Sequence, residues 1–279
     1  MKLLNEPGNT KSMSKYLQLF KISFAQEFVY RVNFVMWRVR NVLQIFVAFF
    51  LWSTVFSDSG KELFGYDKAK ILTYVFGLIL VRAFVLSSKS VDVAGDIANG
   101  DVLNYLLKPV SYFKYWFTRD FASKFLNISF AVLETVILYI ILKPPFFIQT
   151  NILYLSGFLV SVILAMLIYF ILLFATSCVP FWVPEMAWGA QFLVTVVILE
   201  FLSGALFPLD ILPSYMQTFL SYTPFPYLIF FPLQVYLGKV DFAMLTKGVG
   251  VSFVWVILLW YLLQNIWKKG LKVYGAYGR

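Results

Sequence analysis

Long apolar runs separated by short polar connections dominate the chain. A helix needs about 20 apolar residues to cross a bilayer, because each residue advances it by about 1.5 Å. Six stretches meet or approach that length, and they predict an all-α integral membrane protein forming one domain over 1–279. The expected spans are about 41–56 (extended backward through 35–37), 71–87, 121–142, 152–179, 186–207 and 249–267.

The segment before the first span has a different periodicity. Over 13–32, apolar side chains recur at helical spacing, while Lys15, Gln18, Lys21 and Arg31 fill the rest of the wheel. The apolar positions are Met13, Tyr16, Leu17, Phe20, Phe24, Phe28 and Val32. Such a pattern is typical of a helix lying in the membrane surface. We predict an amphipathic elbow helix within 1–40, on the cytoplasmic side; an ordinary start to a long first span is the alternative.

The connection 88–118 predicts two short amphipathic helices. Val91, Ala94, Ile97 and Ala98 share one face of the first, with Asp92 and Asp96 off it. Asn99-Gly100 ends that helix. Asp101 is a suitable N-cap for a second helix over 102–108, which Pro109 stops. The two helices would form a rigid element projecting from the membrane.

The connection 208–247 is too apolar for a solvated loop and too rich in proline for a straight span. Its prolines are Pro208, Pro213, Pro224, Pro226 and Pro232. We predict a re-entrant hairpin of two short helices dipping into the outer leaflet. Backbone at that depth must be packed against protein, because lipid offers it no hydrogen bonds.

The charges set the orientation and exclude several classes of partner. Only 13% of residues are charged, about half the usual share, and the net charge is +9. The basic residues concentrate in the N-terminal segment, in 88–124 and in the tail, which places both termini in the cytoplasm. They lie between apolar runs and not on one polar face, so they favour anionic lipid over nucleic acid. The expected location is the cytoplasmic (inner) cell membrane.

The chain lacks the residues of common catalytic sites. It has no His and one cysteine, Cys178, and it contains no phosphate-binding loop of the G-x-x-x-x-G-K-[ST] type. The one candidate metal cluster is Asp92, Asp96 and Asp101, which could hold Mg²⁺. We interpret these carboxylates as solvated helix faces and a cap. We therefore expect no catalytic site, and no metal or cofactor bound directly.

Three charges fall inside the expected spans, where each costs roughly 2.5–3.5 kcal/mol on insertion scales. They are Arg82, Glu134 and Glu200. For Glu200, followed by Ser203-Gly204, two interpretations stay open: a transport pathway or inter-subunit seam, and an internal ion pair that locks helices together. For Arg82 and Glu134 we favour snorkelling to the headgroups or internal pairing. By this topology Arg82 lies near the inner end of its span and Glu200 in the outer half of its own.

Several local motifs resemble one known family. They are 97–101 (IANGD), 105–110 (YLLKPV), 115–120 (YWFTRD), 207–213 (FPLDILP) and 270–274 (GLKVY). Together with the order of the elements, they resemble ABC-2 type exporter permeases, in a bacterial branch often encoded as permease pairs beside an ATPase. The resemblance extends over nearly the whole chain.

The resemblance implies a non-catalytic subunit that pairs with a second permease, identical or sister, and binds two ABC ATPase subunits. ATP and Mg²⁺ would be bound by that ATPase, and 88–118 would be the coupling segment. The implied ATPase-coupling residues are Asp92, Asp96, Ile97, Gly100, Asp101, Leu103, Leu106 and Leu107. The cargo would be amphiphilic or lipophilic, and some relatives are implicated in tolerance to lipophilic cations. The alternatives are a secondary transporter or channel, and a membrane-embedded transferase using the Asp cluster with Mg²⁺.

Overall fold

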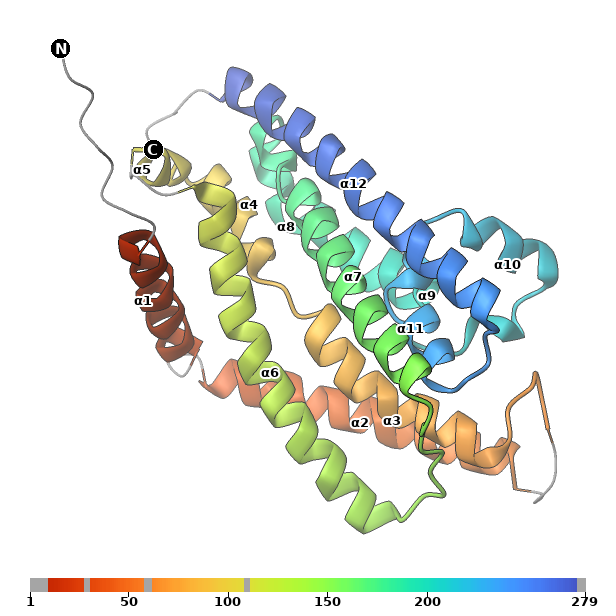
Figure 1. Ribbon diagram of the computed structural model, residues 1–279. Helices are drawn as coiled ribbons and strands as arrows, with labels where there is room; N and C mark the ends of the chain where they lie inside the picture. Colours follow the sequence, from red (N-terminus) through yellow and green to blue (C-terminus); the bar gives the residue numbers. More distant parts are fainter. Residues whose placement is uncertain (1–9, 28–30, 58–61, 108–110, 275–279) are drawn as a thin grey trace.

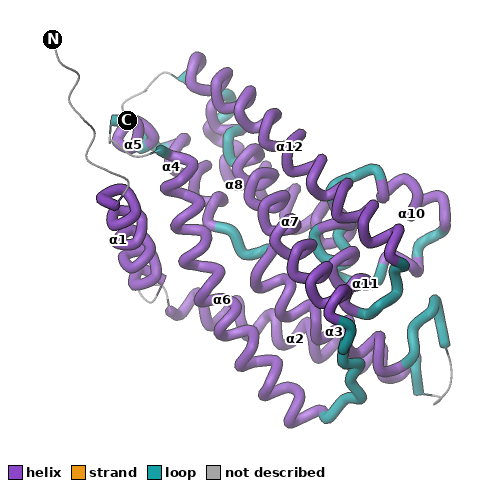
Figure 2. Tube along the Cα trace, viewed as in Figure 1, coloured by secondary structure: helices purple, strands orange, loops and turns teal. Residues whose placement is uncertain are grey.

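A computed structural model describes residues 10–27, 31–57, 62–107 and 111–274 of the chain. Figure 2 shows that these ranges are helices joined by turns and loops. Within them the β-type pairing is limited to one isolated bridge, between Leu63 and Tyr66. The all-α prediction is therefore confirmed for the described part of the chain.

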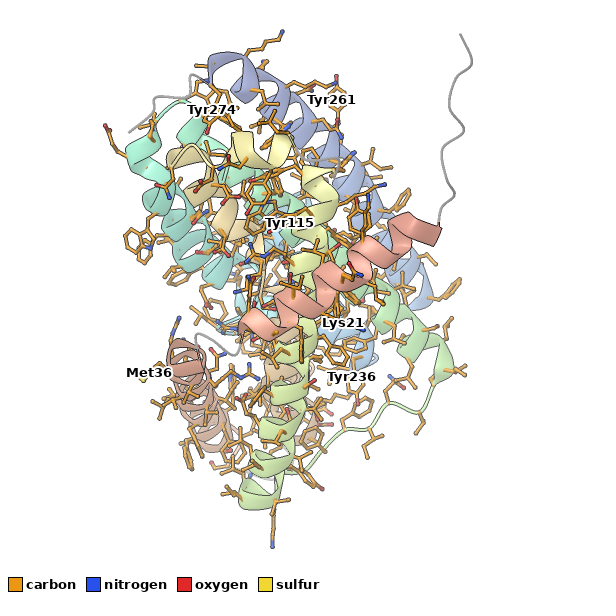
Figure 3. The ribbon with its side chains drawn as sticks, turned by 90° about the vertical axis from the view of Figure 1, so that its left-hand side faces the viewer. Lys21, Met36, Tyr115, Tyr236, Tyr261 and Tyr274 are labelled. Carbon is orange, nitrogen blue, oxygen red and sulfur yellow. The ribbon has the colours of Figure 1, made fainter. Side chains whose placement is uncertain are left out.

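The predicted elbow helix exists, with different bounds. Helix α1 covers Thr10–Glu27, and a new helix, α2, begins at Arg31, so the helix does not run on to 32. Phe28 lies outside the described residues, as do the side chains of Met13 and Val32. Phe20 and Phe24 stack on each other and meet Phe125 of the long helix α6 (Tyr112–Leu142). Figure 3 shows α1, which carries Lys21, crossing α6 obliquely.

The prediction of six spans is confirmed only in part. Among the described residues, four helical stretches are long and apolar enough to cross a membrane: Tyr112–Leu142, Ile152–Phe181, Pro184–Leu202 and Phe242–Val273. The expected first span is helix α2 (Arg31–Val55), which does not reach that standard. Its sequence explains why, since Arg31, Arg38 and Arg40 occupy its first three turns.

The expected second span leads into the coupling segment with little interruption. Helix α3 (Lys68–Val85) is followed by the 3-10 turn η1 (Lys89–Asp92), α4 (Val93–Ala98) and α5 (Val102–Leu106). The axes before and after the break at 86–88 differ by 44°, and the two parts together would make a fifth span. Ser88 caps η1 by accepting the Ser90 N–H.

The fifth expected span is irregular. It begins with a 3-10 turn, η3 (Pro184–Met186), and continues as α8 (Ala187–Phe192). A π-helix, η4 (Leu193–Leu199), follows and leads into α9 (Glu200–Leu202). π-Helical turns are rare and occur often at functional sites.

The external hairpin consists of short helices, as predicted. It contains the turns η5 (Leu209–Ile211) and η6 (Phe225–Tyr227) and the helices α10 (Ser214–Ser221) and α11 (Phe230–Tyr236). Helix α11 is buried against α7 (Ile152–Thr176), whereas α10 exposes Tyr215, Phe219 and Tyr222. The depth of this hairpin in a membrane stays a prediction.

The coupling segment and the external hairpin lie at opposite ends of the bundle. Figure 1 shows α4, α5 and the last turns of α12 (Phe242–Val273) at one end, with α10, α11 and the first turns of α12 toward the other. Close helix packing holds the second end together. A Cβ at Gly248 of α12 would lie 2.2 Å from the Phe231 ring of α11, so only glycine fits there.

Candidate functional site

The tip of the coupling segment presents apolar side chains to its surroundings. On α5, Leu103 is 40% exposed, and Leu107, directly after the helix, is 86% exposed. Asp92 and Asp101 are exposed as well. The side chain of Leu106 lies outside the described part of the chain. Exposed leucines on a polar element are candidates for contact with another protein.

Ile97 does not belong to this exposed set, which corrects the expectation that it docks on a partner. Its side chain is 2% exposed and Val93 is fully buried. The apolar face of α4 packs inward, on α8 and on the 3-10 turn η2 (Val179–Phe181). The helical periodicity was correct, but the face it identified stabilises the fold and is not available to a partner.

Asp101 occupies the N-cap position of α5 without capping it. Its backbone is helical (φ −70°, ψ −17°), and its side chain accepts no backbone N–H. N-caps normally have extended backbone, which turns the carboxylate toward the first turn. Asp101 instead accepts a long bond from the Asn104 amide, at 3.4 Å. The break before it is confirmed, with Gly100 at φ +87°, whereas Pro109 lies outside the described residues.

The base of the coupling segment is attached to α6 by hydrogen bonds to two buried, paired side chains of that helix, Asp120 and Lys124. Lys124 Nζ lies 3.4 Å from Asp120 Oδ2, and the two side chains are 0% and 1% exposed. Asp120 also accepts the Lys89 N–H at 2.8 Å. Lys124 donates to the carbonyls of Val85 and Ser87, at the end of α3. Asp120 and Lys124 therefore provide hydrogen-bond partners for the backbone N–H and carbonyl groups between the end of α3 and the start of η1.

Further contacts connect the same base to α1 and α8. Lys89 Nζ lies 3.0 Å from Glu27 Oε1 of the elbow helix. Gln191 of α8 donates to the carbonyl of Val91 at 2.6 Å and to Ser177 Oγ at 2.8 Å. The elbow helix, α6, α8 and the coupling segment are thus joined at one place.

The three carboxylates of the Asp cluster do not converge. The Tyr112 hydroxyl donates to Asp96 at 2.9 Å, and Asp101 contacts Asn104. In the ranges that the structure describes, no group of three or more Asp, Glu, Cys or His side chains has a metal-binding arrangement.

The three charges predicted inside the spans each belong to an ion pair in the described part of the chain. Arg82 pairs with Glu200, joining α3 to α9, and Arg38 pairs with Glu134 at 2.7 Å, joining α2 to α6. Arg82 and Glu200 therefore lie at one level, which corrects their assignment to opposite halves of the membrane. Arg38, Arg82 and Glu134 line one narrow cleft. The second oxygens of Glu134 and Glu200 are buried and have no hydrogen bond among the described residues.

Ser203 and Gly204 are buried within the single chain. The Ser203 carbonyl accepts the Phe230 N–H at 2.9 Å, and the Gly204 carbonyl accepts the Tyr74 hydroxyl at 2.7 Å. Gly204 has φ +83°, and a Cβ there would meet Tyr74 and Phe230 at under 3 Å. These contacts place the two residues in a turn that seats the external hairpin and not on a subunit surface.

A second polar cluster holds the external hairpin. Asp210 Oδ2 lies 2.7 Å from the Tyr66 hydroxyl and 2.8 Å from both Gln234 Nε2 and Lys239 Nζ. Burial, together with Asp210 nearby, raises the pKa of Tyr66, so the phenol stays protonated as a donor. Burial lowers the pKa of Lys239, and its hydrogen bond to Asp210 opposes that effect.

Sequence reasoning missed these anchoring residues. Lys89, Lys124 and Lys239 were used only as topology signals, and Asp120, Gln191 and Asp210 were not singled out. One signal was present, since Asp120 and Lys124 are four residues apart, a spacing at which helical side chains meet. The other contacts join residues far apart in the sequence and leave no local pattern.

Comparison with known proteins identifies a family. A sequence model described as "ABC-2 family transporter protein" matches residues 42–278, which is most of the chain. The match includes the coupling segment, the Asp210 cluster and the Arg82–Glu200 pair, whereas Arg38 and Glu27 precede the matched range. A search of curated proteins found no matching sequence.

Proposed function

The chain belongs to the ABC-2 transporter family, and from this premise we propose that it is the membrane subunit of an exporter driven by a separate ATPase. Membership makes it a multi-pass component of a transporter, of a type that is typically non-catalytic. The proposal adds the direction of transport, two ATPase copies that bind ATP and Mg²⁺, and a second permease subunit, identical or sister. It also puts both termini on the cytoplasmic side, in agreement with the distribution of basic residues.

The observation that carries the proposal is the contrast between the base and the tip of the coupling segment. The base is tied to α1, α6 and α8 by Lys89, Asp120, Lys124 and Gln191. The tip exposes Leu103 and Leu107. An ATPase that binds the tip would move the whole segment, because these contacts hold its base to the neighbouring helices. The movement would then pass to the elbow helix and the bundle. Gly100 and the Asp residues at 92, 96 and 101 shape and solvate this element, and a coupling role for Leu106 stays a prediction from its sequence position.

Substitution of the exposed leucines tests the docking site. We expect Leu103→Asp with Leu107→Asp to abolish co-purification of the ATPase, because each carboxylate would have to enter an apolar interface. The fold should survive, since both side chains are exposed. Asn104→Asp is the matched control: it adds a charge to the same helix without removing an apolar contact, and it should retain most of the ATPase. A double-Asp protein that still binds the ATPase and stimulates ATP hydrolysis would refute the assignment.

The cargo is proposed to be amphiphilic or lipophilic, because the spans are rich in aromatic and aliphatic side chains. Glu200 gives no particular preference for a lipophilic cation, since Arg82 neutralises it. ATP dependence of transport in membrane vesicles distinguishes this proposal from a secondary transporter or channel.

Glu200 is proposed to act through its ion pair, which opens as cargo passes. Its position directly after the π-helix η4 supports this role, with Ser203 and Gly204 holding the turn behind it. Opening the pair would require the two charges to part within the bundle, which needs energy from outside the chain.

Two variants test this role. Glu200→Gln leaves Arg82 without its counter-charge and should lower the free energy of unfolding, and Arg82→Gln with Glu200→Gln should recover part of that stability. Both should lose transport per folded molecule. Glu134→Gln, which breaks the other pair, is the control and should lower stability while sparing transport. A Glu200→Gln protein that assembles and transports normally would remove Glu200 from the site.

A further inference from the structure

An apolar groove of about 410 Å³ lies where α6, α7 and α12 meet, next to α1. Phe117, Phe170, Val256 and Trp260 contribute to its apolar walls. Tyr16 of the elbow helix and Lys114, in the first turn of α6, also line it. Phe117 is 36% exposed and Trp260 is 39% exposed, so the groove is open on one side.

The helices around the groove determine what can fill it. α6, α7 and α12 are three of the stretches long and apolar enough to span a membrane, and the groove is lined on α6 by residues near the start of that helix. We therefore expect the groove to open toward lipid at the level where the headgroups meet the acyl chains. Leaving such a groove empty would forfeit dispersion contacts along its whole wall. A helix about 10 Å across occupies roughly 400 Å³ for each turn, so the volume would admit one turn of a partner helix. A thin, flexible chain can instead occupy the groove along its length.

We propose that the groove holds an acyl chain of an anionic phospholipid from the leaflet nearest the coupling segment, with the lipid phosphate beside Lys114. Charge complementarity selects the headgroup. Lys114 is exposed at the edge of the groove, and Lys15 is exposed on α1 directly before Tyr16. Of the two, Lys114 lines the groove and would meet the phosphate, since a lysine at the membrane surface attracts anionic lipid. The lipid would connect the elbow helix to α6 and α12. This inference requires only that the chain is embedded in a membrane, and not that it exports anything.

Quenching of Trp260 by brominated lipid tests the proposal. The full-length protein is reconstituted into phosphatidylcholine nanodiscs containing increasing fractions of brominated phosphatidylglycerol or, in parallel, brominated phosphatidylcholine. The contribution of Trp260 is the difference between the wild type and Trp260→Phe. We expect brominated phosphatidylglycerol to quench Trp260 at a mole fraction about five-fold lower than brominated phosphatidylcholine does. The attraction of one lysine at the membrane surface, about 1 kcal/mol, corresponds to that ratio of affinities.

Matched variants separate the headgroup contact from the groove. Lys114→Gln should abolish the preference for phosphatidylglycerol, while Lys268→Gln, at an exposed position of α12, should retain it. Val256→Phe should reduce quenching by filling the groove, while Ile257→Phe, on the exposed face next to it, should not. Equal quenching by both lipids would show non-selective contact, and no quenching by either would show that protein covers the groove; each overturns the proposal. Should Val256→Phe fail to fold, Lys114→Gln decides the outcome.

Discussion

The coupling segment and the external hairpin are built from similar parts and are attached differently. Each consists of short helices and turns, and each is held by a lysine paired with an aspartate. At the coupling segment, Asp120 and Lys124 are 1% and 0% exposed. At the external hairpin, Asp210 and Lys239 are 27% and 14% exposed. The coupling segment is therefore anchored by the more deeply buried pair, although it also carries the more exposed side chain, Leu107 at 86% against Tyr222 at 76% in the external hairpin.

The residues left exposed at the two ends also differ. The external hairpin exposes the aromatics Tyr215, Phe219 and Tyr222, a composition that suits a membrane interface. The coupling segment exposes Leu103 and Leu107, which have no polar group to place at such an interface. The comparison teaches that two elements with similar helices can serve opposite purposes. The coupling segment is held at its base and along α4 and leaves Leu103 and Leu107 exposed, whereas the external hairpin is held by the burial of α11.

The largest expected effect is at the base of the coupling segment. Asp120→Ala leaves the Lys124 ammonium buried without its counter-charge and the Lys89 N–H without its acceptor, so we expect the free energy of unfolding to fall by about 3–5 kcal/mol. Thermal or denaturant unfolding in detergent measures this loss.

Asp120→Leu with Lys124→Met is the informative companion variant. Removal of both charges leaves no unpaired ion, so the double variant should be clearly more stable than Asp120→Ala alone. It should still uncouple ATP hydrolysis from transport, because the base of the segment would then be held only by its other contacts. A double variant as unstable as the single one would mean that the bonds to Lys89 and to the carbonyls at 85 and 87 outweigh the ion pair.

A smaller effect is expected at the external hairpin. Asp210→Ala removes the shared acceptor of Tyr66, Gln234 and Lys239, but partial exposure lets water replace some of these bonds. We expect a loss of about 2 kcal/mol in the free energy of unfolding. Binding of the ATPase should be unaffected, since the hairpin lies at the other end of the bundle.

Tyr66→Phe, which removes a single donor, is the control for Asp210→Ala and should cost about 1 kcal/mol. The comparison between the two ends would fail if Asp210→Ala uncoupled ATP hydrolysis from transport as strongly as Asp120→Leu with Lys124→Met. That result would mean that the external hairpin also transmits movement.

Much of the helical layout follows from local sequence, as particular elements show. The apolar periodicity of 13–32 located α1, and the proline-rich 208–247 located α10 and α11. Asn99-Gly100 marked the break between α4 and α5, where Gly100 adopts φ +87°. These features depend on residues within one or two turns of each other, so a single segment contains the whole signal. The count of spans was less accurate, because α2 combines helical periodicity with three arginines.

The amino-acid sequence by itself determined that the chain is a helical membrane protein, where most of its helices lie, and which family it resembles. Only the tertiary structure decided which charges meet. Arg82 and Glu200 are 118 positions apart, and their pairing depends on the rotation and depth of two helices that share no local pattern. The same holds for Ile97, whose helical face was evident but whose burial depends on α8 lying against it. Local periodicity determines which face of a helix is apolar, and packing between distant segments determines what that face contacts.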